Sequence, residues 1–292
     1  MVGGAGLMSQ PFSLRAAPGA TGPAIAFDGD ALILANDTLA RSDGTGGWIE
    51  LSAPAAGSIL SLATHPGRPG RITAGLAPAG VALSEDGGHG WKARSQGLPN
   101  APVTAVTVAA ADPDTIYAAI RGDGLWKSED AGRSWALAMD RPWLADAERD
   151  LTALASVDLA TGMDGIWIYA GTELGLTRVP DCFCRWQEVQ PGDAMDALVS
   201  GNPAPSGAPL PDGETINALV SAASLPTRLY AALPSGIWGS KDAGIVWSQR
   251  SSTSALAVAV HPTNADHVVA IVGDGLVESR DGGANWTALA RA

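Results

Sequence analysis

One eight-residue pattern, Ser-x-Asp-x-Gly-x-x-Trp, recurs along this chain and constrains its fold more than any other feature. Two degenerate copies keep only the five-residue interval from Asp to Trp, at Asp43–Trp48 and Asp181–Trp186. Four copies keep the whole pattern, as SEDGGHGW at 84–91, SEDAGRSW at 128–135, SKDAGIVW at 240–247 and SRDGGANW at 279–286. A pattern written six times in 292 residues indicates a chain built from repeats of one structural unit.

A second fixed spacing supports the repeat. The chain has 10 Trp but only 3 Tyr and 3 Phe, which is expected when one Trp-bearing position is repeated. Its 36 Gly and 20 Pro are expected of a globular chain with many turns. In five copies a glycine stands six residues before the aspartate and an apolar residue follows it; these glycines are Gly80, Gly124, Gly175, Gly236 and Gly275.

Each repeat also contains short apolar runs with the composition of β-strands. In the third repeat they are 103–110, 115–120, 124–129 and 134–139, which are rich in Val, Ile, Ala and aromatic residues. Successive tryptophans of the pattern are 39 to 61 residues apart, and a four-stranded unit of roughly 40–50 residues is typical of a β-propeller blade. We therefore predict an all-β chain folded as a six-bladed β-propeller of four-stranded antiparallel blades.

The repeat boundaries predict one propeller domain at 24–292, preceded by an N-terminal extension at 1–23. The last blade has four runs of its own, so the sequence shows no overlap of the two ends of the chain within one blade; an outer strand or a plug formed by Pro11–Ala16 is the alternative. The expected blades cover about 24–53, 58–97, 102–140, 150–189, 214–251 and 254–292. Their innermost strands should begin near Ala24, Ile59, Val103, Leu151, Ile216 and Ala255.

The residues of the repeated pattern have a local structural interpretation. The Asp side chain accepts backbone N–H bonds from the residues after it, and the glycine adopts a backbone angle closed to other residues. The Trp supplies an apolar plate that packs over the turn. A carboxylate-lined cation or sugar site is the alternative interpretation. The residues assigned this turn role are Asp43, Trp48, Ser84, Asp86, Gly88, Trp91, Ser128, Asp130, Gly132, Trp135, Asp181, Trp186, Ser240, Asp242, Gly244, Trp247, Ser279, Asp281, Gly283 and Trp286.

This pattern resembles the Asp-box, or BNR, repeat, and the resemblance extends from about Ala24 to the end of the chain. Families with this repeat include sialidases, xyloglucanase-type glycoside hydrolases, sortilin-like receptors and the photosystem II assembly-factor propellers. The resemblance implies the propeller fold and no single activity, because the repeat is a turn scaffold. Copies such as GLWKSEDAGRSW at 124–135 look most like the assembly-factor propellers, which bind partner proteins and usually have seven blades.

Charge and hydropathy exclude two classes of partner. The formal net charge is −12, from 18 basic and 30 acidic residues, whereas a nucleic-acid binder needs a concentrated basic face. No segment approaches the roughly 20 apolar residues that span a bilayer. The first residues show no basic region followed by a continuous apolar run, so no signal peptide is recognisable. Both a cytoplasmic chain and a secreted chain that has lost its signal fit this sequence.

The sequence predicts no catalytic residue. Glycoside hydrolysis needs two carboxyl groups across a cleft, and Asp37, Asp123 and Asp274 occupy comparable places after the second strand of their blades. We interpret Asp123 and Asp274 as turn residues, because Asp-Gly is the strongest hairpin dipeptide. Resemblance to xyloglucanase-type enzymes implies a catalytic Asp in an early D-x-G-G segment, and the residues after Asp37 lack those glycines.

The remaining reactive residue types also point to structure. Resemblance to sialidases implies a tyrosine nucleophile, but Tyr117, Tyr169 and Tyr230 all stand 17 or 18 residues before a pattern Trp, as expected of core residues. No histidine pair has metal-ligand spacing. Cys182 and Cys184 are too few for a disulfide framework or a closed zinc site, and we expect two thiols there. A soft metal ion shared by the two is the alternative; otherwise we predict no metal and no cofactor.

Two long connections mark a candidate binding face. Asp140–Asp150 and Gln190–Glu214 each link the outer strand of one blade to the inner strand of the next, so both belong on one face. The opposite face carries short turns, and we expect little room for a pocket there. The candidate residues are Trp143, Asp146, Glu148, Asp150, Asp193, Asp196 and Asp212.

We predict a non-catalytic interaction scaffold whose acidic face binds a protein partner, such as a basic segment. The alternative is a glycoside hydrolase acting on a polysaccharide, with Trp143 as a platform for sugar stacking. We also expect that deleting Ala204–Leu210 leaves folding nearly intact, because shortening a surface loop changes its closure entropy only slightly.

Overall fold

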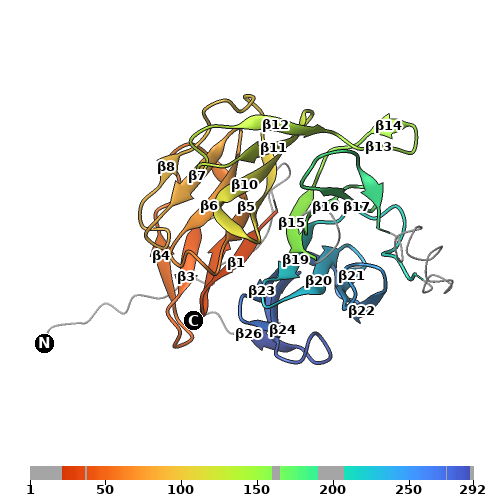
Figure 1. The fold of residues 1–292 in the computed structure, drawn as a ribbon. Coiled ribbons are helices and arrows are strands. Elements are labelled where there is room, and N and C mark those ends of the chain that lie inside the picture. The colour runs from red at the N-terminus through yellow and green to blue at the C-terminus, as the bar shows by residue number, and fades with distance from the viewer. Residues whose placement is uncertain (1–21, 37, 160–164, 190–206, 274, 290–292) are drawn as a thin grey trace, which may run out of the picture.

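The computed structural model describes residues 22–36, 38–159, 165–189, 207–273 and 275–289, and it confirms the predicted fold class. Six four-stranded antiparallel sheets form the blades of a β-propeller (Figure 1). In every blade the strands neighbour each other in chain order, and the first strand lies innermost, next to the first strands of the adjacent blades. The described part contains no helix with the length and hydropathy needed to cross a membrane.

The first three blades are formed by twelve strands. They are β1 (Ala24–Asp28), β2 (Ala31–Ala35), β3 (Leu39–Ser42) and β4 (Trp48–Leu51); β5 (Ser58–Thr64), β6 (Ile72–Ala77), β7 (Val81–Ser84) and β8 (Lys92–Ala93); and β9 (Val103–Ala109), β10 (Asp112–Ile120), β11 (Gly124–Ser128) and β12 (Ala136–Asp140).

The last three blades follow a small hairpin of β13 (Trp143–Leu144) and β14 (Ala147–Glu148). They are β15 (Ala153–Asp158), β16 (Ile166–Gly171), β17 (Leu176–Pro180) and β18 (Gln187–Glu188); β19 (Ala218–Ala222), β20 (Leu225–Leu233), β21 (Gly236–Ser240) and β22 (Trp247–Ser251); and β23 (Ala255–His261), β24 (Asn264–Val272), β25 (Gly275–Ser279) and β26 (Thr287–Leu289). All six innermost strands begin within two residues of the predicted positions.

The hydrophobic core lies between blades rather than inside them. One buried cluster joins Ala119 and Leu125 of the third blade to Ile168 and Ala170 of the fourth. The run Ile116–Ile120 in β10 is buried at every residue because neighbouring blades cover both faces of its sheet. This explains why the middle strands read as continuous apolar runs instead of alternating ones.

The first and last blades close the ring through side chains. In the described residues, neither sheet takes a strand from the other end of the chain; Pro11–Ala16 lie outside them. Ile25 and Phe27 of the first blade pack instead against Ala257, Ala259 and Ile271 of the sixth in one buried cluster. Closure of the propeller therefore depends on this apolar seam, which we call the closing seam.

Two histidines of the sixth blade flank the closing seam. The imidazoles of His261 and His267 stack with their centroids 5.1 Å apart, and each makes a T-shaped contact with the Phe27 ring at a centroid distance of 5.1 Å. His267 Nε2 lies 2.7 Å from Glu278 Oε1, and His261 Nε2 lies 2.8 Å from Asp30 Oδ1. Burial lowers the pKa of His267, and the Glu278 carboxylate opposes this effect without cancelling it.

Acidification should therefore weaken the closing seam. Because the folded-state pKa of His267 lies below the ordinary value of 6.5, the unfolded chain binds a proton more readily. The stability that this histidine contributes is complete above pH 6.5 and is lost as the pH falls from 6.5 toward the lower pKa of the folded state. We expect the melting temperature to fall with pH in this window and His267→Gln to flatten the slope. An unchanged slope in that variant would contradict the assignment.

Each of the four complete patterns forms the same kind of hydrogen-bonded turn. In the second blade Ser84 Oγ donates to Asp86 Oδ1 and accepts from the Gly88 N–H, and the same carboxylate oxygen accepts from the Gly90 N–H, each at 2.8 Å. The equivalent bonds in blades three, five and six measure 2.8 to 2.9 Å. Hydrogen bonds from the residue four positions on lower the pKa of Asp130 and Asp281 to about 2.

The tryptophan of the pattern also joins neighbouring blades, which sequence reasoning missed. The indole N–H of Trp91 donates to the carbonyl oxygen of Ser52 at 3.0 Å, 39 residues earlier at the end of the first blade. Trp135, Trp186 and Trp286 donate in the same way to the outer strand of the preceding blade, at 2.7 to 3.0 Å. Each such indole is therefore an inter-blade link as well as a cover for its own turn.

The three tyrosines are core residues, as predicted. Tyr117, Tyr169 and Tyr230 are fully buried. Their hydroxyls donate across blade boundaries, to Asp181 Oδ1 at 2.6 Å, the Ala243 carbonyl at 2.9 Å and the Ala265 carbonyl at 2.8 Å, respectively. Burial raises the pKa of all three, which is opposite to what a tyrosine nucleophile needs.

Candidate functional site

The connection between the third and fourth blades forms the β13–β14 hairpin, which projects from the body of the propeller (Figure 1). Its two turn residues, Ala145 and Asp146, both have positive φ (49° and 62°), as the tight primed hairpin turns require. Trp143 opens the hairpin and is 69% exposed, more than the other exposed large hydrophobic residues of the described part. The hairpin therefore presents one large apolar side chain to solvent.

Ion pairs brace the hairpin against the propeller. Arg141 pairs with Glu148 and, at 3.2 Å, with Asp150. Asp150 Oδ1 also accepts the N–H of Gly122 at 2.9 Å. Arg149 pairs with Glu173 at 2.7 Å. Gly122 and Glu173 lie in the turns between the second and third strands of blades three and four, so the base of the hairpin is tied to two blades.

The structure separates the sequence-predicted candidates into three groups. Trp143, Asp146 and Glu148 lie on the hairpin, and Asp150 lies at its base. Arg141 pairs with Glu148 and Asp150 and offsets their negative charges. Asp212 is exposed just before the fifth blade. Asp193 and Asp196 lie outside the described residues. Among the described carboxylates of this set, only Asp146 and Asp212 are exposed without an ion pair to Arg141.

The end of the second long connection is part of the core, contrary to the expectation of a removable surface loop. Leu210 is only 6% exposed and belongs to the buried cluster between blades four and five. Ala208 donates its N–H to Ile245 O (3.0 Å) and accepts the Trp247 N–H (2.7 Å). The expectation that deleting Ala204–Leu210 leaves folding nearly intact is wrong, because the deletion removes a core side chain and these backbone bonds.

Leu210→Ala should accordingly destabilise the chain by about 2–3 kcal/mol, from lost apolar burial and the cavity that remains. Leu225→Ala, at a 44% exposed position in β20, is the matched control and should change stability by less than about 0.5 kcal/mol. Urea unfolding followed by tryptophan fluorescence measures both. Equal effects of the two substitutions would contradict the placement of Leu210 in the core.

Of the three carboxylates considered for hydrolysis, the structure describes only that of Asp123. The Asp123 carboxylate accepts the Trp126 indole N–H at 2.5 Å within its own turn, as its interpretation as a turn residue predicts. Asp37 and Asp274 lie outside the described residues. A glycosidase pair needs two carboxyl groups roughly 5–9.5 Å apart beside a substrate cleft. In the described residues, the two cavities of the propeller axis offer a single carboxylate between them, that of Asp158.

The larger axial cavity opens on the face where little room was expected. A cavity of about 190 Å³ lies at the carboxyl ends of the inner strands, where its lining includes Thr64, His65, Ser156 and Asp158. A smaller one of about 80 Å³ lies at the beginnings of the same strands, on the side of the long connections. The expectation for the opposite face is wrong, because side chains at the carboxyl ends of the inner strands line this cavity.

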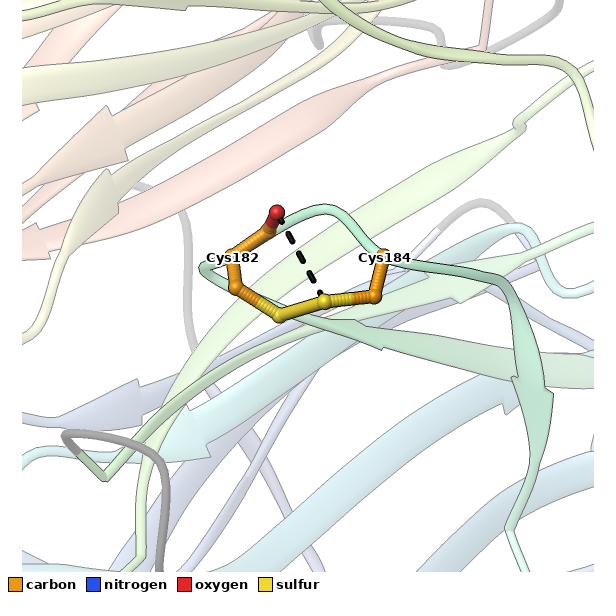
Figure 2. The surroundings of a disulfide bond; sticks show 2 residues. All are labelled: Cys182 and Cys184. Atoms are coloured by element: carbon orange, nitrogen blue, oxygen red, sulfur yellow. Dashed lines mark hydrogen bonds between the residues drawn. A yellow bond between two sulfur atoms is a disulfide. The ribbon is translucent and has the colours of Figure 1, made fainter.

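The prediction of two thiols is also wrong. Cys182 and Cys184 form a disulfide at the exposed turn between β17 and β18 (Figure 2). The Asp of this degenerate copy does not close the turn; Asp181 Oδ1 accepts the Tyr117 hydroxyl and pairs with Lys127 Nζ at 3.3 Å. Within the described ranges, no three His, Cys, Asp or Glu side chains gather as a metal site would require.

No protein-family model and no curated protein matches this sequence. Among solved structures, the chain is similar to the GH74 xyloglucanase from Xanthomonas campestris (20% identity, TM-score 0.57) and the GH74 enzyme of Niastella koreensis (17%, 0.62). The alignments include 92% and 94% of this chain but only 47% and 46% of the two GH74 chains. This chain therefore spans about half the length of those enzymes.

A third similar structure is a propeller of comparable length. It is YCF48 bound to a D1 peptide, which is 16% identical with a TM-score of 0.50. That alignment includes 97% of this chain and 86% of the YCF48 chain. Since all three identities are low, these similarities establish the propeller fold and leave the activity open.

Proposed function

We propose that this chain is a non-catalytic interaction scaffold that binds a protein segment through the face carrying the β13–β14 hairpin. The observation that carries the proposal is Trp143. An aromatic side chain that is 69% exposed, on a hairpin whose base is bonded to two blades, is suited to be an interface anchor.

Charge supports a basic partner. The chain has a net charge of −12, and Asp146 on the hairpin and Asp212 before the fifth blade are both exposed. Such a surface attracts Lys- and Arg-bearing segments over a Debye length of about 10 Å at 0.1 M salt. The similarity in length and fold to a propeller that binds a peptide supports the same kind of activity by analogy only.

We also identify the repeated hydrogen-bonded turn as the Asp-box. The bonds shared by Ser84, Asp86 and Gly88, and the indole of Trp91 over that turn, support this identification in the copies that keep the whole pattern. In this interpretation these residues are structural and none of them contacts the partner.

A glycoside hydrolase acting on a polysaccharide is the second candidate. The GH74 structures favour it, because their TM-scores of 0.57 and 0.62 exceed that of YCF48. Trp143 would then stack against a sugar ring. The single carboxylate that lines the described cavities opposes it, since the reaction needs two.

One paired screen separates the candidates. The chain is titrated with immobilised peptides of matched length and either basic or acidic composition, and is incubated in parallel with a broad panel of polysaccharides. We expect basic peptides to bind, more weakly as salt rises, and no reducing sugar to appear. Release of reducing sugar that a single Asp→Asn substitution abolishes would overturn the scaffold proposal.

A further inference from the structure

The Cys182–Cys184 disulfide encloses a single residue, Phe183, at the tip of the fourth blade's outer turn (Figure 2). Both cysteines are exposed. A cross-link removes less chain entropy from the unfolded state the fewer residues it encloses. This bond therefore constrains the unfolded chain far less than a link between distant strands would, and holding the propeller together does not explain it.

The turn has contacts of its own that do not depend on the disulfide. The Phe183 N–H donates to the Pro180 carbonyl at 2.8 Å, and the Phe183 ring lies 6.1 Å from the Tyr117 ring and 5.6 Å from Lys127 Nζ. Trp186 links the blade to the Asp140 carbonyl at 2.7 Å, as the equivalent indoles do in other blades. The fold at this turn is thus maintained by hydrogen bonds and packing.

The surroundings of the sulfur atoms suit exchange with another thiol. Attack on a disulfide requires access to a sulfur, and both cysteines are on the surface. The exposed Arg185 follows Cys184 directly, and nearby positive charge stabilises a leaving thiolate. Cys184 Sγ also lies 3.8 Å from the Cys182 carbonyl oxygen, drawn as the dashed line in Figure 2.

We propose that Cys182 and Cys184 form a redox-active pair that undergoes thiol–disulfide exchange with an external thiol. A thiolate of the co-reactant attacks one sulfur and forms a mixed disulfide, and the other cysteine leaves as a thiolate. A second thiolate of the co-reactant then attacks the co-reactant's sulfur atom in the mixed disulfide, and the second cysteine leaves as a thiolate. The pair gains two electrons and two protons as two thiols, and the co-reactant is oxidised to a disulfide.

The first test measures exchange in the folded chain. The whole chain is equilibrated in glutathione buffers of increasing reduced-to-oxidised ratio, alkylated, and weighed as an intact protein. We expect a two-electron transition to the doubly alkylated form, with a rate within about threefold of that for the same chain unfolded in urea, because the sulfurs are already accessible. A parallel series with a small dithiol distinguishes a monothiol co-reactant from a dithiol one. Exchange that occurs only after unfolding would overturn the proposal.

The second test asks whether the bond is only a structural staple. The double substitution Cys182→Ser with Cys184→Ser should lower the melting temperature by no more than about 5 °C. The same should hold for the wild-type chain after reduction. A larger loss in both would show that the fold depends on the disulfide and would overturn the proposed role.

Discussion

Replacing Phe27 with alanine is expected to lower the free energy of unfolding by about 3–5 kcal/mol, because it leaves a cavity in the closing seam. The Phe27 ring is only 4% exposed and packs in the cluster that joins the first and sixth blades. It also lies in T-shaped contact with both imidazoles, those of His261 and His267. Among the described strands none is exchanged across this boundary, so their contact there is made by side-chain packing.

Urea unfolding measures this effect against Ile49→Ala as a control. Ile49 is an apolar residue of the same blade but is 49% exposed on β4, so its truncation should change stability by less than about 0.5 kcal/mol. If Phe27→Ala costs no more than the control, apolar packing does not close the ring.

A second large effect is expected for Gly236→Ala, at about 3–5 kcal/mol. Gly236 opens β21 with φ of 133°, a conformation that side chains rarely adopt. A Cβ there would overlap the carbonyl oxygen of Ser251 in β22, so the outer strand would have to move. At Gly124 and Gly236 the repeated glycine is thus needed for close approach of the third and fourth strands.

Gly275→Ala is the matched control, because Gly275 occupies the equivalent position in the sixth blade. Its φ is not in the left-handed region, and a Cβ there would meet its nearest neighbour, the Val272 carbonyl oxygen, at 3.9 Å. We expect a change of less than about 1 kcal/mol. Thermal unfolding of both variants decides the matter, and a similar loss in the two would contradict the steric explanation.

The fold was predictable from the sequence because its signals are local. The hydrogen-bonded turn needs its Ser, Asp, Gly and Trp within eight residues, so the spacing survives in the sequence wherever the turn does. Apolar runs between the turns then place the inner strands to within two residues. Only the copies at Asp43 and Asp181 lose part of the signal.

The contacts between blades were not predictable in the same way. The indole N–H of Trp135 donates to the carbonyl oxygen of Arg94, 41 residues away, and a backbone acceptor leaves no signature in the residue type. Leu210 is one apolar residue in a Pro- and Gly-rich connection, so its burial against the fifth blade has no periodic signal.

The candidate site was predictable only in part. Trp143 is recognisable as an aromatic residue outside the repeat, and the structure places it on an exposed hairpin. The pairing of Arg141 with Glu148 and Asp150, which reduces the free negative charge, depends on a hairpin register that the sequence does not specify. The cysteines likewise bond because the turn brings their Cα atoms to 5.5 Å.

The dissociation constant of the tightest-binding basic peptide, measured by calorimetry for the wild-type chain and for Trp143→Ala, tests the central claim most directly. Leu137→Ala, which truncates a 48% exposed side chain on β12, serves as the control. The account predicts that Trp143→Ala weakens binding by about thirtyfold, as expected of an interface anchor worth about 2 kcal/mol. The control should bind as the wild type does. Equal affinity of all three chains would contradict the claim that this face holds the partner.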